Sequence, residues 1–166
     1  MLDRMQVKNK QLEELQNSEF TFITWDISYA TGIPLIDSQH RELVNLTNQL
    51  YNACRGGNEK AGSAFKEAMS AMVEYVRFHF STEQKLLERI NYPDYKKHKM
   101  MHDTLIKDIL EAAQNYHEGK KFVPNQFVRT LKEWVFGHIA VYDKNYSFYV
   151  HEQKRKGLLT DKQLEG

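Results

Sequence analysis

Residues 72–102 read MVEYVRFHFSTEQKLLERINYPDYKKHKMMH, and this stretch contains two amphipathic segments separated by a short break at residues 91–94. On both sides of the break, apolar residues recur at alternating steps of three and four, which is the pattern of a helix with one buried face. Four polar residues interrupt these apolar faces: His79, Glu83, His98 and His102. Because the connection is short, the two helices are expected to run antiparallel with these faces opposed.

The same periodicity extends over the rest of the chain. Breaks at residues 55–58 and 119–124, and at Gly157, delimit a helix on either side of the central pair. The apolar face of the last segment is predicted to continue through Val141, Asn145 and Phe148. Four helices joined by short loops predict an all-α fold, an up-down-up-down antiparallel four-helix bundle.

The residues before the first helix follow a different pattern. Aromatic and apolar residues between 20 and 36 approach a period of two without a partner strand, which predicts an extended N-terminal arm lying across the bundle. Asp37 is expected to cap the first helix and Asp94 the third. We therefore divide the chain into a polar, helical N-terminal extension (1–19), the bundle (20–151) and a polar C-terminal tail (152–166).

Bulk composition excludes several classes of protein. The 166 residues fit one domain, and 23 basic against 22 acidic residues leave a net charge of +1, which argues against a nucleic-acid-binding surface. The single cysteine, Cys54, allows no internal disulfide and is typical of a reducing compartment. No apolar run approaches the ~20 residues that span a bilayer. The expected location is cytoplasmic.

Five of the seven histidines lie on the predicted buried faces: His40, His79, His98, His102 and His138. Burying unpaired polar groups costs kilocalories, so five buried imidazoles require an explanation. Residues four apart lie on one helix face, which lets His79 and Glu83, or His98 and His102, converge on one metal position. Neutral imidazole suits iron, zinc, copper or nickel, and a carboxylate can bridge two cations.

The last candidate ligand, Asp143, has a different spacing. It follows His138 by five residues, and five steps of ~100° on a regular helix put the two side chains ~140° apart. Either Asp143 reaches the site from a flank, or the helix contains a local π-bulge at this point. Regular hydrogen bonding between residues four apart through 136–145 would exclude the bulge.

Each of these motifs has a simpler explanation when taken alone. A single buried histidine is more often part of a core, the His98/His102 pair could be unrelated surface residues, and His79/Glu83 could be an ion pair. Together, however, the candidates lie on four helices at heights that antiparallel packing brings together, which favours a two-metal site. The chain has no Gly-rich phosphate loop, Cys-x-x-Cys, His-Glu-x-x-His or nucleophile elbow, so a hydrolase has no support.

The ordered set of His40, His79-x3-Glu83, His98-x3-His102 and His138-x4-Asp143 resembles the hemerythrin family. The preceding segment, Trp25 and then residues 32–40 (GIPLIDSQH), is similar to its bacterial branch, and the resemblance covers roughly residues 22–150. It implies two non-haem irons bridged by hydroxide or oxide. The implied ligands are His98, His102 and His138 at one iron, His40 and His79 at the other, which keeps an open position, and Glu83 and Asp143 as bridges.

We also expect Phe80, Trp134, Val135 and Ile139 to wall the pocket, and Tyr146 to lie near the site. The resemblance implies reversible dioxygen binding, for oxygen carriage or storage. A second interpretation is an oxygen or redox sensor, whose signalling partner reads the bundle through the N-terminal helix. A third is a redox enzyme acting on peroxide or nitric oxide, ranked last because no acid–base residue is evident beside the open iron. The absence of Glu-x-x-His disfavours a ferritin-like oxidase.

Overall fold

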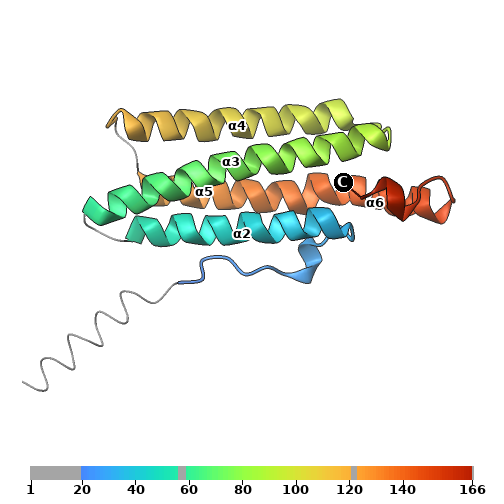
Figure 1. Cartoon of the computed structure of the whole chain (residues 1–166), viewed down its shortest axis with the longest axis horizontal. Helices are drawn as coiled ribbons and strands as arrows, with labels where there is room; N and C mark the ends of the chain where they lie inside the picture. Colours follow the sequence, from blue (N-terminus) through green and yellow to red (C-terminus); the bar gives the residue numbers. More distant parts are fainter. Residues whose placement is uncertain (1–19, 56–58, 121–122, 166) are drawn as a thin grey trace, which may run out of the picture.

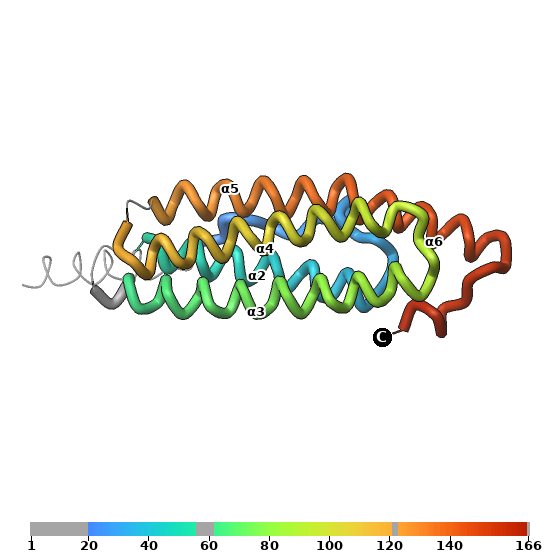
Figure 2. The backbone as a smooth tube through the Cα atoms, turned by 90° about the horizontal axis from the view of Figure 1, so that it is seen from above, coloured from blue at the N-terminus to red at the C-terminus, as the bar shows by residue number. Residues whose placement is uncertain are grey.

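The computed structural model describes residues 20–55, 59–120 and 123–165. Over these residues it is a bundle of four antiparallel helical rods, which confirms the predicted all-α architecture (Figure 1). The rods are α2 (Pro34–Arg55), α3 (Glu59–Arg89), α4 (Tyr95–His117) and a composite of α5 (Pro124–Gly137), η2 (His138–Asp143) and α6 (Lys144–Arg155). Figure 2 shows that α6 continues the direction of α5, so the composite acts as the fourth helix.

The helix ends follow the predicted breaks, with one correction. Asp94 is the N-cap residue of α4, although its side chain makes no capping hydrogen bond. Asp37, in contrast, is not the N-cap of α2, because that helix begins at Pro34, whose fixed φ suits a first turn. Asp37 instead accepts hydrogen bonds from the backbone N–H groups of Thr31 (2.6 Å) and Gly32 (3.0 Å), and so fixes the chain entering the helix.

The predicted N-terminal arm is present and runs alongside α2 (Figure 1). It is extended from residue 20 and ends in the short helix η1 (Ile27–Tyr29). The Asn48 side chain on α2 accepts from the N–H groups of Phe22 (2.9 Å) and Ile23 (2.8 Å) and donates to the Ile23 carbonyl (2.9 Å). One side chain thereby satisfies backbone groups that have no strand partner.

The apolar core consists of two layers. The first contains Leu43, Leu50, Met72, Val76, Leu105, Ile109, Val135 and Ile139, among others. The second contains Ile33, Ile36, Leu86, Leu87, Ile90, Tyr146 and Val150 with two leucines from the C-terminus. Most candidate ligands fall between the two layers in sequence, as His40 does between Ile36 and Leu43, whereas His79 and His138 directly precede Phe80 and Ile139 of the first layer. A buried polar layer is thus held between two apolar ones.

The C-terminal residues pack on the bundle. The predicted domain boundary at residue 151 falls inside α6, which ends at Arg155. Beyond it, Leu159 and Leu164 are buried in the second apolar layer, and η3 (Asp161–Gln163) lies between them. The expected polar tail thus includes two core residues, whereas the expected N-terminal helix lies outside the described residues. None of the described helices combines the length and apolar character needed to cross a membrane.

We predict that Gly32→Ala destabilises the fold more than Gly119→Ala. Both glycines have positive φ (76° and 65°), where an alanine costs about 1–2 kcal/mol. A Cβ at Gly32 would also lie 2.7 Å from Nε2 of His151, whereas a Cβ at Gly119 meets nothing within 4 Å. Urea unfolding should show the larger loss for Gly32→Ala, and adding His151→Ala should recover the excess. Equal losses in the two alanine variants would contradict the steric contribution.

Candidate metal centre

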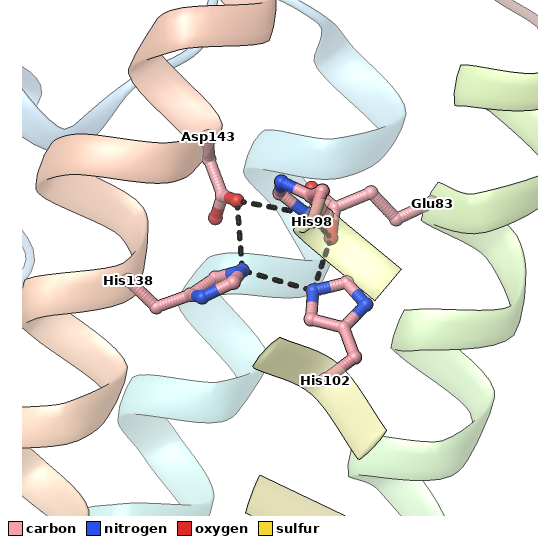
Figure 3. Close-up of side chains that lie close together, drawn as sticks. All are labelled: Glu83, His98, His102, His138 and Asp143. Carbon is pink, nitrogen blue, oxygen red and sulfur yellow. Dashed lines mark hydrogen bonds and ion pairs between the residues drawn. The ribbon is translucent and has the colours of Figure 1, made fainter. Parts of the chain in front are cut away.

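All seven predicted ligands are buried and lie in the polar layer between the two apolar ones. They fall into two groups that share one carboxylate: Glu83, His98, His102, His138 and Asp143, and then His40, His79 and Glu83. In each group one ligating atom per residue lies within 4.8 Å of the others. Figure 3 shows the larger group, whose side chains point toward one another from α3, α4 and the fourth rod.

The imidazoles approach the carboxylates through Nε2. Glu83 Oε2 lies 3.1 Å from His102, 3.4 Å from His98 and 3.8 Å from His79. The two carboxylate oxygens of Asp143 contact different imidazoles. Its Oδ1 lies 3.1 Å from His138 and 3.5 Å from His98, and its Oδ2 lies 3.2 Å from His40. Each carboxylate therefore contacts imidazoles of both groups, which is the arrangement required of a bridging ligand.

A π-helical turn brings Asp143 into the site. The segment η2 (His138–Asp143) is π-helical, which confirms the bulge as the solution to the five-residue spacing. Hydrogen bonds between residues five apart stack such residues on one face, so Asp143 lies on the same side as His138. The turn also shifts every later position by one residue. Val141, Asn145 and Phe148, predicted to be buried, are exposed, whereas Tyr146 and Val150 are buried.

The charge states within the site are set by burial and by mutual contacts. Burial lowers the pKa of His79 to about 3 and also lowers the pKa of His102, which leaves these rings neutral and able to donate a lone pair. Burial likewise opposes the charged form of His138, but the adjacent Asp143 carboxylate outweighs it and raises the pKa. Hydrogen bonds from His102 and His98 overcome the burial of Glu83 and hold its pKa well below the usual range.

The donor set fits a pair of cations. Glu83 Oε1 and both oxygens of Asp143 are buried without a hydrogen-bond partner among the described residues, as are both ring nitrogens of His40. His102 and His138 face each other through Nε2 at 2.9 Å. Ionised carboxylates beside the neutral rings of His79 and His102 leave many acceptors and few protons, a deficit that bound cations would compensate. Five imidazoles and two carboxylates are suitable ligands for iron.

A small apolar cavity adjoins the site. It measures about 10 Å³ and is lined by the predicted wall residues Phe80, Trp134, Val135 and Ile139, together with the ligand candidates His79, His138 and Asp143. Its remaining lining residues, Leu43, Val76 and Leu105, lie on the predicted apolar faces, where their spacing could not distinguish a cavity wall from ordinary core. Tyr146 is not among the lining residues. It contacts the site elsewhere, with its ring 5.6 Å from that of His98.

Aromatic rings fix the orientation of two of the imidazoles. Phe80 stacks on His102 with ring centroids 3.6 Å apart and an interplanar angle of 1°. Trp134 stacks on His138 at 4.8 Å and 11°. Because both aromatic residues also line the cavity, they separate these rings from solvent as well as orienting them.

Comparison with protein families places most of the chain in one of them. Residues 31–147 match the family described as hemerythrin HHE cation binding domain. The match begins at the arm that leads into α2 and ends just after the π-helical turn, so it includes all seven candidate ligands. It thus coincides with the part of the chain that builds the site.

Individual relatives agree with that match. The chain is 27% identical to a bacteriohemerythrin of Methylococcus capsulatus, covering 75% of this chain and 93% of the relative. It is 31% identical to a bacteriohemerythrin of Pseudomonas aeruginosa, covering 75% and 78%. Among solved structures, it is similar to wild-type hemerythrin with a TM-score of 0.71 at 27% identity, covering 76% of this chain and 95% of the other.

We predict that Glu83→Ala abolishes stoichiometric loading with Fe(II). The substitution removes a carboxylate that contacts three imidazoles from both groups, whereas Glu88→Ala removes an exposed carboxylate from the same helix. Anaerobic loading, desalting and elemental analysis should give two irons per chain for the wild type and Glu88→Ala, and fewer for Glu83→Ala. Circular dichroism should confirm that the variants stay helical. A Glu83→Ala protein that retains two irons would remove Glu83 from the site.

Proposed function

This chain belongs to the hemerythrin family, and from that premise we propose that it binds dioxygen reversibly and serves to carry or store it. Membership implies a non-haem di-iron, oxygen-binding domain, and the buried histidine and carboxylate cluster agrees with it. The proposal depends above all on one observation. The candidate ligands form one set of three imidazoles and one set of two imidazoles, and two carboxylates contact both sets. This cluster adjoins a cavity of about 10 Å³.

The proposed ligand assignment follows the two groups. His98, His102 and His138 would hold one iron, and His40 and His79 the other. Glu83 and Asp143 would serve both, because each contacts imidazoles of both groups. Three imidazoles against two leave the second iron one protein ligand short. That deficit supplies a position for an exogenous ligand, as an open metal site requires.

The cavity limits what that ligand can be. A volume of about 10 Å³ is comparable to the space that one water molecule needs, so the cavity suits a very small molecule and not an organic substrate. Its titratable lining residues, namely His79, His138 and Asp143, are all proposed iron ligands. A site whose acid–base groups are occupied by metal favours binding over catalysis.

The side chains around the cavity would protect bound dioxygen from water and protons. When loaded, the iron pair supplies the electrons that dioxygen takes up on binding and returns on release. Phe80, Trp134, Val135 and Ile139 give the cavity an apolar wall that disfavours water, and none of these four side chains carries an acidic proton to deliver to the ligand. Withholding protons favours release of oxygen over loss of a reduced product.

We predict a reversible change in absorption. Air added to the reduced, iron-loaded protein should produce near-ultraviolet and visible bands that disappear under vacuum and return in air. Zinc-loaded protein is the matched control, because zinc has no accessible redox change and should give no bands. Iron loading at two per chain without any oxygen-dependent band would contradict the proposed function.

The rate of spontaneous oxidation distinguishes carriage from sensing. We expect the air-exposed protein to convert slowly to its ferric form, because the apolar wall limits access of water and protons to the cavity. Absorption followed over hours in air, together with the fraction of bands recovered after each vacuum cycle, measures this rate. Conversion within the first cycle would contradict a carrier or store and would favour a sensor read by a signalling partner.

A further inference from the structure

Two glutamines contact imidazoles of the metal site from the outside. Gln39 on α2 is buried, and its Oε1 lies 3.0 Å from Nδ1 of His79 on α3. Gln84 on α3 is half-buried, and its side-chain amide lies 3.3 Å from Nδ1 of His102 on α4. Each glutamine directly follows or precedes a candidate ligand in sequence, and each reaches across to a ligand of the next helix.

The ring nitrogen that each glutamine contacts is the one left over from metal binding. All five imidazoles turn Nε2 toward the carboxylates, so binding through Nε2 puts the ring proton on Nδ1, which must then donate. Gln39 Oε1 is already placed to accept that proton. At Gln84, a half-turn of the amide presents Oε1 instead of Nε2 to the same nitrogen, an exchange that preserves side-chain shape.

We propose that Gln39 and Gln84 are positioning residues that fix His79 and His102 and set how strongly these rings donate to the irons. The proposal rests on the proposed metal site. An acceptor behind an imidazole orients the ring and raises its basicity, and a carboxylate does so more than a neutral amide. Glutamine thus fixes each ring while limiting electron donation, which restrains formation of the ferric state that does not bind oxygen.

The two glutamines serve different irons. His79 belongs to the pair of imidazoles with the open position, so Gln39 acts where the ligand binds. His102 belongs to the set of three, so Gln84 acts on the other iron. The Nδ1 atoms of His40 and His138 are buried without a hydrogen-bond partner among the described residues. Each iron therefore has one imidazole fixed by an amide and another whose outer nitrogen makes no such bond.

The test compares Gln39→Met, Gln39→Glu and Gln49→Glu. Methionine keeps the length of the side chain but removes the acceptor, and glutamate strengthens the acceptor. Gln49 is exposed on the same helix, so Gln49→Glu adds the same charge without contacting the site. The midpoint potential of the iron pair is measured anaerobically by spectroelectrochemistry, Fe(II) affinity by competition with a chelator, and helical content by circular dichroism.

We expect Gln39→Met to weaken Fe(II) binding by about 10- to 100-fold and to raise the potential. Gln39→Glu should retain iron, lower the potential and oxidise faster in air than the wild type, and Gln49→Glu should match the wild type. Unchanged potentials in both Gln39 variants, or an equal decrease in Gln39→Glu and Gln49→Glu, would overturn the proposal.

A second pair of variants guards against failure to fold. Gln84→Met and Gln84→Glu alter a half-buried side chain, and they should shift the potential in the same directions as the Gln39 variants. Because potential and affinity are measured without oxygen, these shifts can appear even in a protein that fails to bind oxygen reversibly. Shifted potentials without reversible oxygen binding would refute the proposed function alone. Reversible oxygen binding with unchanged potentials would refute only the role of the glutamines.

Discussion

The central constraint on this fold is the burial of two ionised carboxylates side by side. Glu83 and Asp143 are fully buried within one cluster, and like charges in a poorly polarisable interior repel strongly. Asp143 raises the pKa of His138, which can compensate part of this charge when protonated, but burial lowers the pKa of His79 and His102. Cations bound between the carboxylates would remove the conflict, and metal binding would then be coupled to folding of the bundle.

The two apolar layers explain how such a polar layer is tolerated. Leucine, isoleucine and aromatic residues pack above and below it on all four rods and supply the burial free energy that the polar layer lacks. The C-terminal residues Leu159 and Leu164 complete the second layer. The arm and the Asp37 contacts fix the first turn of α2, and Asp37 lies three residues before His40. Segments that look peripheral in sequence thus close or orient the polar layer.

Spacing and family resemblance predicted much of this structure, and the failures have identifiable causes. Periodicity located four helices and the buried faces of three, and the resemblance singled out the same seven ligand candidates. The buried face predicted for the fourth helix was wrong after His138, because a π-helical turn changes the helical phase and exposes Val141 and Phe148. Asp37 was mistaken for a cap because helix propensity does not distinguish a cap from a first-turn residue. Gln39 was overlooked because contacts between helices leave no local pattern.

The π-helical turn links the polar layer to the packing of the second apolar layer. On a regular helix, the face that carries His138 would continue through Val141, Asn145 and Phe148, and Asp143 would point ~140° away. One extra residue in the turn brings Asp143 into the cluster of candidate ligands and also turns Tyr146 and Val150 into the second apolar layer. The burial of these two residues stabilises the same backbone conformation that delivers the carboxylate. Hydrophobic packing of α6 therefore helps to hold the Asp143 carboxylate within the cluster, and the five-residue spacing reflects a requirement of the core as well as of the proposed metal site.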